Sequence, residues 1–501
     1  MKREWLFPRY RERILIMHGH HYNQFLISAT EREVAPGFEA TKHGGWILYK
    51  NGDLPLLLLQ TLDGKPLGCI LGLIIDTQVS VLFKGPVIIP ILSSDSCAAK
   101  EMAIHQFLDR VGGRFVCIIA DGDLQRLYLD AAGSLSCVYS NQHGIMASTP
   151  ELILNEKSYY SDMDHDLVAK LDVSFHGWFP GGVTPHKSIS RLLPNHYLDL
   201  RSWRQVRHWP ESKIEMTTSA EWTASKIADN IKASIRAVTN ARKAYLPVTA
   251  GRDSRMLLAC AKAELDRTKL VIFVDIKENV DQYIVRKLES IFGLDVDYLP
   301  IAYASLEERD QWYYEVGHCV GGRISEIYPT LRKLDHKRII MPGFGGEVGR
   351  AYYWSAKDTR STEITPEELL RRFHLPPHPV LRRALRGWLA EVSELLDTFQ
   401  LLDLAYIEHR LGAWGGPQTY GQVKFTDHIY PMLHRAIFKD ILSLPPEYKA
   451  GNCLPVDIIR KEWPELLNVP FNKYPGIKGV IEKGKKIRRL PSKISRIIRG
   501  Y

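Results

Sequence analysis

Hydrophobic and polar positions follow two different periods along this chain of 501 residues. Before about residue 205, short apolar or alternating runs are separated by Gly, Asp and Asn, which is typical of strands and turns. Four of these runs predict strands at 13–17, 45–49, 54–60 and 67–76. Two more runs, 114–120 and 126–129, flank Asp121-Gly122-Asp123 and predict a β-hairpin. Strands that follow one another so closely indicate a β-rich sheet or sandwich.

After Pro210 the apolar positions take the period of a helix. Thr218-Ser219-Ala220-Glu221 matches a capping box at a helix start. One apolar face then follows at Ala224, Ile227, Ala228, Ile231, Ile235 and Val238. We therefore expect a long amphipathic helix that begins near residue 218.

Strands and helices alternate in the next part of the chain. Apolar runs predict strands at 244–249, 269–274, 295–301 and 338–341. Helices are expected between them, one ending near Leu265 and another spanning 281–292 before Gly293, a good helix C-cap. This order predicts an α/β fold with a doubly wound parallel sheet covered on both faces, whose ligands bind beyond the carboxyl ends of the strands. From Thr365 onward we expect mostly helix.

Composition fits an ordinary globular protein of about two domains, with 45% hydrophobic and 25% charged residues. The longest apolar run, 67–75, is well short of the ~20 residues that a membrane-spanning helix needs. The first five residues, Met1 to Trp5, lack the apolar stretch of a signal peptide. Seven cysteines, an odd number without a Cys-x-x-Cys pair, favour reduced thiols in a cytoplasmic protein and give no support for zinc.

The net charge of +9 comes mainly from one end of the chain. Eight basic residues and no acidic one lie from Lys483 to Arg499, so the rest of the chain is close to neutral. We therefore expect no nucleic-acid partner; only Tyr501 could stack on a base. The segment Lys483–Arg499 could make weak contact with an anionic membrane, and a solvated tail is the favoured alternative.

The segment after the strand at 244–249 is a candidate phosphate site. Small residues and hydroxyls form the turn, and a helix start follows it: Val248, Thr249, Ala250, Gly251, Arg252, Asp253 and Ser254. Such a turn can offer backbone N–H groups and a helix N-terminus to an anion. The alternative is an ordinary strand–turn–helix junction capped by Asp253 or Ser254. A methyl group at Ala250 requires a negative φ there.

This hexapeptide, Thr249 to Ser254, resembles the Ser-Gly-Gly-x-Asp-Ser loop of the ATP pyrophosphatases (PP-loop class). With the continuation Arg255-Met256-Leu257-Leu258-Ala259 it is most similar to the asparagine synthetase family. The resemblance implies that the loop and Val274, at the end of the next strand, bind ATP, and that Asp253 serves Mg²⁺. Asp281 resembles the family's acid at the start of the following helix, although a first-turn helix Asp would look the same.

A second glycine-rich turn resembles the family's Gly-x-Gly-x-Asp-Glu loop. It contains Gly343, Gly345 and Gly346, which by resemblance close on the nucleotide, and then Glu347. Glu347 is implied as a metal and catalytic residue, while Val348 stands where the family has a second carboxylate.

Two later segments also resemble the family. Lys473 falls at the family's lysine that stabilises negative charge near the acyl-adenylate, a role that suits a fixed ammonium group; an ordinary surface lysine is the alternative. His434 replaces an Asp in the segment that begins at Tyr430, so the substrate side of the site is expected to differ.

The N-terminal half resembles the family's glutamine amidotransferase domain more weakly. Gly113-Arg114-Phe115 and Leu129-Asp130-Ala131-Ala132-Gly133 carry this similarity. Such glutaminases use an N-terminal cysteine, whereas position 2 is Lys2 and the first cysteine is Cys69. We therefore expect a degenerate N-terminal-nucleophile-type β-rich domain without glutaminase activity.

Together these features predict three regions and one activity. The regions are 1–210, amidotransferase-like; 211–480, ATP pyrophosphatase-like; and 481–501, the basic tail. The resemblance implies a ligase that uses ATP and Mg²⁺ to adenylate a small carboxylate and joins it to ammonia or an amine, in bacterial specialised-metabolite or polysaccharide biosynthesis. The alternatives are an ordinary asparagine synthase, a tRNA-modifying enzyme of the same class, and a non-catalytic nucleotide-binding homologue.

Overall fold

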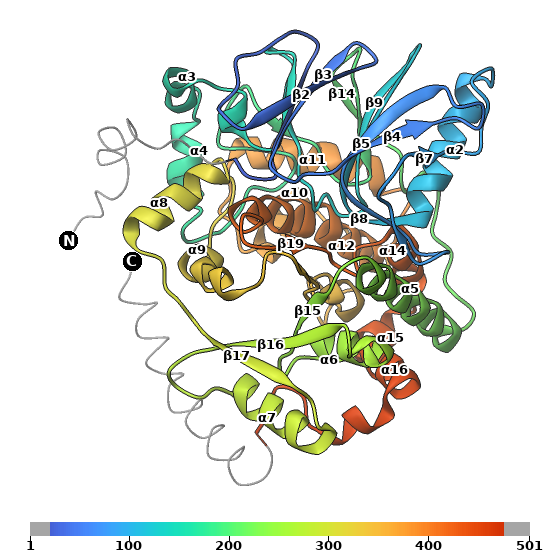
Figure 1. Cartoon of the computed structure of the whole chain (residues 1–501), viewed down its shortest axis with the longest axis vertical. Coiled ribbons are helices and arrows are strands. Elements are labelled where there is room, and N and C mark those ends of the chain that lie inside the picture. The colour runs from blue at the N-terminus through green and yellow to red at the C-terminus, as the bar shows by residue number, and fades with distance from the viewer. Residues whose placement is uncertain (1–20, 475–501) are drawn as a thin grey trace.

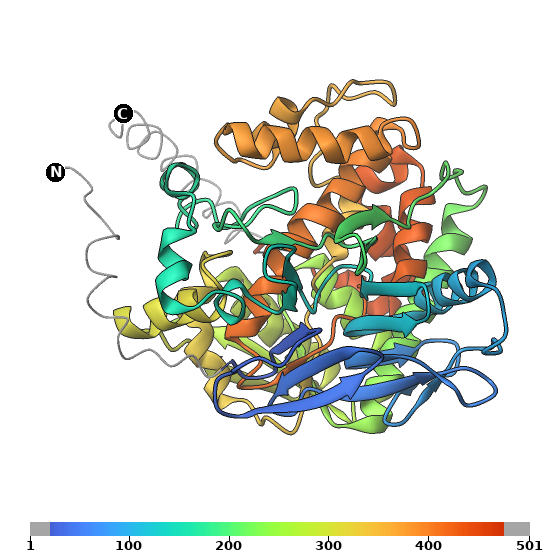
Figure 2. The same cartoon turned by 90° about the horizontal axis from the view of Figure 1, so that it is seen from above.

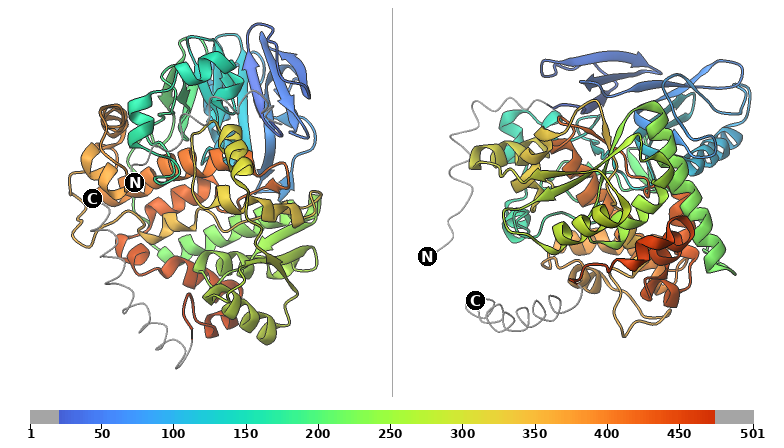
Figure 3. Two further views of the ribbon diagram at one scale, coloured as in Figure 1. Left: turned by 90° about the vertical axis from the view of Figure 1, so that its left-hand side faces the viewer. Right: turned by 60° about the horizontal axis from the view of Figure 1, so that its bottom comes forward.

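A computed structural model describes residues 21–474 of the chain (Figure 1). The expected strand at 13–17 and the basic segment Lys483–Arg499 lie outside the described residues. In Figure 3 (left) the strands from the first 210 residues fill the upper part of the molecule, and the parallel sheet with its helices fills the lower part. No helix among residues 21–474 is long and apolar enough to cross a membrane.

Two largely antiparallel sheets form the N-terminal part. The six-stranded sheet has, in spatial order, β12 (Ser190–Arg191), β10 (Val138–Ser140), β11 (Ile145–Ala147), β1 (Phe25–Ser28), β3 (Trp46–Asn51) and β2 (Phe38–His43). The eight-stranded sheet has β14 (Arg204–Arg207), β13 (His196–Asp199), β9 (Leu124–Leu129), β8 (Val111–Asp121), β5 (Pro66–Asp76), β4 (Leu56–Gln60) and β7 (Val87–Ile88), with β6 (Val81–Leu82) beside β5. The prediction of a β-rich region is confirmed, including the β8–β9 hairpin, in which Val116 pairs with Leu129.

The two sheets share a buried core. Ile27 and Leu48 of the first sheet pack in one cluster with Leu71 and Ile118 of the second. The opposite face of the eight-stranded sheet is covered by α2 (Cys97–Arg110), a helix that the apolar pattern did not indicate. On the opposite face of the six-stranded sheet lies α3 (Glu156–Ser161), whereas Leu167 of α4 (His165–Lys170) belongs to the largest core cluster. This part of the chain is thus a sandwich with helices on its outer faces.

The third sheet is parallel throughout. Its five strands lie in the order β17 (Val296–Pro300), β16 (Thr268–Val274), β15 (Ala244–Pro247), β18 (Ile339–Ile340) and β19 (Asp427–His428). The four strands expected from the apolar runs are confirmed. The fifth strand, β19, comes from a region expected to be helical, and its two residues are too few to give a pattern.

Side chains of the parallel sheet alternate between two buried faces. On one face Leu246 and Ile272 join the largest core cluster together with α5 (Ala220–Ala241), α6 (Arg252–Cys260) and α7 (Val280–Phe292). On the other face Tyr245 and Val271 pack with Leu331 of the 3₁₀ helix η4 (Tyr328–Lys333). The α/β class and a parallel sheet covered on both sides are therefore confirmed.

Helix ends are partly as expected. Gly293 caps α7 in the left-handed region at φ 65°, as expected. The capping box at Thr218 is wrong by one residue: α5 is capped by Ser219, whose side chain accepts a hydrogen bond from the Trp222 N–H at 3.2 Å. Helix α6 ends at Cys260, earlier than expected, and the short 3₁₀ helix η3 (Lys262–Glu264) follows.

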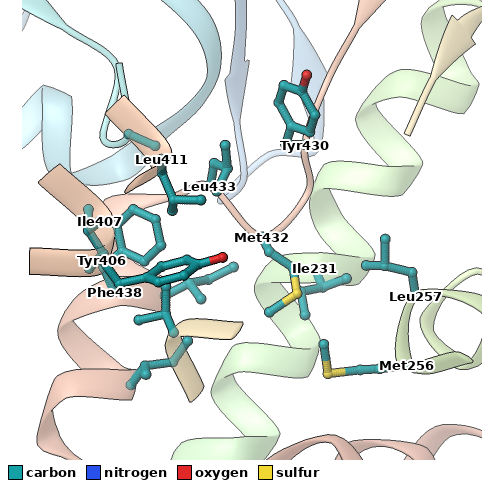
Figure 4. Packing of buried hydrophobic residues seen from close by; sticks show 14 of the residues in the cluster. Ile231, Met256, Leu257, Tyr406, Ile407, Leu411, Tyr430, Met432, Leu433 and Phe438 are labelled. Carbon is teal, nitrogen blue, oxygen red and sulfur yellow. The ribbon is translucent and has the colours of Figure 1, made fainter. Parts of the chain in front are cut away.

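The remaining helices surround the parallel sheet and fill the space between it and the sandwich (Figures 1 and 2). They are α8 (Leu306–Glu315), α9 (Ile324–Ile327), α10 (Pro366–Arg372), α11 (Pro379–Val392), α12 (Thr398–Ala405), α13 (Gly416–Gln418), α14 (Arg435–Ser443), α15 (Pro446–Ala450) and α16 (Cys453–Glu462), with a π-helix, η6 (Tyr406–Gly415), and short 3₁₀ helices at η2 (Pro150–Leu152), η5 (Gly346–Arg350), η7 (Thr419–Gly421) and η8 (Pro464–Asn468). Figure 4 shows Ile231 of α5, Met256 and Leu257 of α6 and Tyr406 of η6 around Met432, so helices far apart in sequence share one core.

Candidate functional site

The two predicted loops meet at the carboxyl edge of the parallel sheet. Strands β15 and β18 are neighbours, so the loops that follow them emerge side by side. A Cβ placed on Gly343 would lie 3.1 Å from the Ser254 backbone nitrogen, and one on Gly346 would lie 2.4 Å from Asp253 Oδ1. The glycine-rich loop therefore rests directly on the first turn of α6, and the two loops form one cluster.

The loop at 249–254 is held by its own hydroxyl groups. Thr249 Oγ1 and Ser254 Oγ are 2.8 Å apart, and the Thr249 N–H donates to Ser254 Oγ at 3.1 Å. Gly251 is the N-cap of α6, and no side chain caps the helix. Capping of this helix by Asp253 or Ser254 is therefore wrong. The N–H of the N-cap residue Gly251 instead donates to Thr249 Oγ1 at 3.1 Å.

Ala250 fits the loop without strain. It is fully buried, and it is not among the described residues with positive φ, so its methyl group is compatible with the backbone. Its N–H donates to Asp281 Oδ1 at 2.9 Å, and its carbonyl accepts from the Asn472 N–H at 3.0 Å. These contacts bring Asp281, at the start of α7, and the segment that contains Lys473 to the loop.

Two carboxylates and one guanidinium form the charged centre of the site. Arg350 Nη2 lies 2.6 Å from Asp253 Oδ2 and 3.7 Å from Glu347 Oε1. The second oxygens, Asp253 Oδ1 and Glu347 Oε2, are buried and have no hydrogen-bond partner in the part of the chain that the structure describes. Burial and the nearby Glu347 charge raise the pKa of Asp253, whereas Arg350 opposes this shift.

This pair of carboxylates fits Mg²⁺ as part of a shared site. Hard oxygen ligands suit Mg²⁺, which commonly takes one or two carboxylates and completes its shell with phosphate and water. Within residues 21–474 no group of three or more His, Cys, Asp and Glu side chains could hold a metal, so Asp253 and Glu347 would depend on such additional ligands. Val348 supplies none, because it is fully buried in the core.

Cationic side chains lie beside the loop. The guanidinium groups of Arg252 and Arg255 lie 5.1 and 4.2 Å from the centre of the Phe471 ring. Arg255 donates to the carbonyls of Val469 and of Pro470, and burial lowers its pKa to about 10. These contacts fix the 469–472 segment against α6.

Lys473 and Val274 occupy less central positions. Lys473 is exposed, and it follows Asn472, which is bonded to Ala250. Val274 ends β16 at the same sheet edge, where it is half-buried and its carbonyl accepts from the Ile301 N–H at 2.9 Å.

The π-helix η6 adds residues that the sequence did not indicate. It presents Arg410 over the Trp414 ring at 3.9 Å, and Trp414 lies 5.7 Å, between ring centres, from Phe344 of the glycine-rich loop. Burial and the Glu347 charge raise the pKa of Tyr406 well above its usual value. π-Helical turns often occur at functional sites, but no residue pattern in the sequence separates this one from an α-helix.

His434 has a structural position. It caps α14 by accepting from the Ala436 N–H at 3.0 Å, and its Nε2 lies 3.1 Å from the Arg110 carbonyl of the sandwich. Burial lowers its pKa to about 4. The side chain therefore joins the two halves of the molecule as a buried, neutral imidazole.

The sandwich holds its motif residues in structural roles. Asp130 accepts hydrogen bonds from the Ala132 and Ser134 N–H groups and thereby shapes the turn after β9. Cys69 is buried in β5, and burial raises the pKa of its thiol to about 12, so it is a poor source of thiolate.

A cavity of about 450 Å³ lies away from this cluster. Its walls include Asn23 of the sandwich and Arg242, Lys337 and Asp427 at the amino ends of parallel strands. It is therefore at the sheet edge opposite to Asp253. The candidate site is therefore defined by the contact of the two loops and by Asp253, Glu347 and Arg350, and not by this cavity.

Comparison with known proteins adds no assignment. No protein-family model matches the sequence, and no match was found among curated proteins.

Proposed function

We propose that this protein is an ATP-dependent, AMP-forming ligase similar to asparagine synthetases, with a PP-loop nucleotide site at Thr249–Ser254. One observation carries the proposal: Asp253 and Glu347 come from two separate loops, both contact Arg350, and each keeps a buried oxygen without a hydrogen-bond partner among residues 21–474. Buried carboxylate oxygens are rarely left unsatisfied. A Mg²⁺ ion that also binds phosphate would provide these carboxylate oxygens with a positively charged partner.

The loop supplies the groups that a triphosphate needs. The uncapped start of α6 offers N–H groups and a favourable dipole, and Arg252, Arg255 and Arg350 place positive charge around it. Mg²⁺, when bound, would neutralise part of the phosphate charge. Val274 and the glycines Gly343 and Gly345 would border the nucleotide.

The proposed reaction has two steps. A carboxylate oxygen of the substrate attacks the α-phosphorus of ATP, so that the acyl–phosphate bond forms and pyrophosphate leaves with the electron pair of the broken P–O bond. The nitrogen of ammonia or an amine then attacks the acyl carbon, AMP leaves with its electron pair, and the nitrogen loses one proton. Lys473 would stabilise the negative charge that develops near the acyl-adenylate.

The nitrogen source we propose is free ammonia or the amine of a second substrate. The buried Cys69 offers no accessible thiolate, so glutamine would not be hydrolysed. We further propose that the sandwich is a degenerate amidotransferase domain, and that the protein works in the reducing cytoplasm on a bacterial specialised metabolite or a polysaccharide precursor.

A second candidate function is that of a non-catalytic nucleotide-binding homologue. The observation that favours it is Val348, which takes the place of the family's second carboxylate and lies in the core. Loss of that carboxylate could leave nucleotide binding without chemistry.

ATP–pyrophosphate exchange over a panel of carboxylic acids, including aspartate, separates these functions. We expect exchange with at least one acid, its loss in Asp253→Asn, and no change in the control Asp266→Asn, whose side chain is 76% exposed. Nucleotide binding without exchange on any acid would favour the non-catalytic homologue, and absence of nucleotide binding would overturn both. Exchange on aspartate followed by glutamine-dependent asparagine formation would identify an ordinary asparagine synthase.

A further inference from the structure

Arg350 occupies the place of a cation between the two carboxylates. Its Nη2 contacts Asp253 at 2.6 Å and approaches Glu347 to 3.7 Å, while its Nε is buried without a hydrogen-bond partner in the described part of the chain. All three side chains are at most one-quarter exposed. One guanidinium thus faces two carboxylates, and among the described residues neither carboxylate has a second ion-pair partner.

This arrangement would let Mg²⁺ replace Arg350 as the partner of the Asp253 carboxylate. Mg²⁺ binds carboxylate oxygen at about 2.0–2.1 Å, so a metal on Asp253 would stand next to the guanidinium that now contacts the same carboxylate. Repulsion between the two cations would weaken the Arg350–Asp253 pair. A released guanidinium presents a fork of donors that matches phosphate oxygens.

We propose that Arg350 is an exchangeable counter-ion: it pairs with Asp253 when no metal is bound and contacts the pyrophosphate portion of the nucleotide once Mg²⁺ takes its place. The residue follows the glycine-rich loop and is not part of the motif that carries the family resemblance. The inference rests on the proposed nucleotide site and concerns how that site changes from its metal-free to its loaded form.

The other described cationic side chains near the site do not pair with the two carboxylates and could not be replaced by Mg²⁺ in the same way. Arg252 and Arg255 stack on Phe471, and Arg255 is also bonded to two backbone carbonyls. Lys473 is exposed at the rim. Among the described cations, Arg350 is the one within ion-pair distance of both Asp253 and Glu347.

The test is the binding of inorganic pyrophosphate, measured by titration calorimetry with and without Mg²⁺. In the wild type we expect binding at least ten-fold tighter with Mg²⁺. Asp253→Asn should bind metal-free pyrophosphate at least ten-fold tighter than the wild type, because Arg350 is then free, and Asp253→Asn/Arg350→Met should lose that gain. The control Arg236→Met removes a half-exposed arginine of α5 and should bind as the wild type does.

A second measurement separates exchange from a structural role. Mn²⁺ binding without nucleotide, followed by electron paramagnetic resonance, should be about ten-fold tighter in Arg350→Met, since the competing cation is gone. Arg350→Lys should restore wild-type Mn²⁺ affinity through its charge, and it should bind Mg²⁺-pyrophosphate more weakly because it lacks the fork.

The outcomes distinguish this inference from the proposed function. Wild-type protein that binds no pyrophosphate with Mg²⁺ would overturn the nucleotide site itself. If the wild type binds but the double variant keeps the gain of Asp253→Asn, or Arg350→Met binds Mn²⁺ no tighter than the wild type, only the exchange is overturned.

Discussion

Replacing Gly346 by alanine is the sharpest steric test of the two-loop site. Gly346 is not among the described residues with positive φ, so alanine brings no backbone strain. Its new Cβ would lie 2.4 Å from Asp253 Oδ1 and 2.5 Å from the carboxylate carbon. Since ordinary contacts of a Cβ begin at 3.4 Å, the carboxylate would have to retreat by about 1 Å.

That displacement acts on the charged centre. The 2.6 Å contact between Asp253 and Arg350 would be broken or rearranged, and the proposed metal ligand Asp253 would move with it. A misplacement of about 1 Å can lower a rate by about 100-fold, which corresponds to about 2.7 kcal/mol. Because the new Cβ would also lie 2.9 Å from Asp253 Cβ, which moves only with the backbone, we expect the free energy of unfolding to fall by about 1–3 kcal/mol.

The assays are ATP–pyrophosphate exchange and urea unfolding of the same preparations. The matched control is Gly387→Ala in α11, where a new Cβ meets no atom within 4 Å. This control should keep full exchange and be stabilised by about 0.5–1 kcal/mol. Exchange by Gly346→Ala within two-fold of the wild type would refute the contact between the two loops as the basis of the site.

Three further changes test other parts of the structure. Lys473→Met should lower the rate of amide formation about 100-fold in a steady-state assay with little change in ATP affinity. The reason is that the Lys473 ammonium is proposed to stabilise the negative charge that develops near the acyl-adenylate. Gly293→Ala should lower the free energy of unfolding in urea by about 1 kcal/mol, since φ at the α7 cap is 65°. His434 has a pKa lowered to about 4, so the unfolded state takes up its proton first as pH falls below 6.5. Stability should then fall by up to about 1.4 kcal/mol per pH unit down to pH 4, and His434→Gln should reduce this slope in urea titrations at pH 7 and pH 5.

Each of these expectations has a contradicting result. Unchanged amide formation in Lys473→Met would contradict the proposed role and favour the alternative of an ordinary surface lysine. Full stability of Gly293→Ala would contradict the left-handed cap, and an unaltered pH slope in His434→Gln would contradict the buried neutral imidazole.

The parallel sheet could be predicted because its signals are local. The runs that became β15, β16 and β17 are apolar and are followed by turns and helix starts, so neighbouring residues carry the information. β19 could not be found in this way. Asp427 and His428 are polar, and they become a strand only because they pair with Ile339 and Ile340, nearly ninety positions earlier in the chain.

The candidate site shows the same division. The two loops could be predicted as strand-end turns, and their closeness followed from the rule that parallel strands end at one edge. The role of Arg350 could not, because its contact with Asp253 joins residues 97 positions apart. Asp281 was noted in the sequence, but its bond to the Ala250 N–H depends on how α7 packs beside the loop.

The glycines of the second loop give the strongest physical reason to treat both loops as one unit. Gly345 requires glycine for its backbone, at φ 98°, whereas Gly343 and Gly346 require it for space against Ser254 and Asp253. A turn that served only to reverse the chain would need the first kind of glycine but not the second. Because Gly343 and Gly346 have no side chain, the backbone of this loop can approach Ser254 and Asp253 closely. A substitution that moves either loop should therefore displace residues of the other.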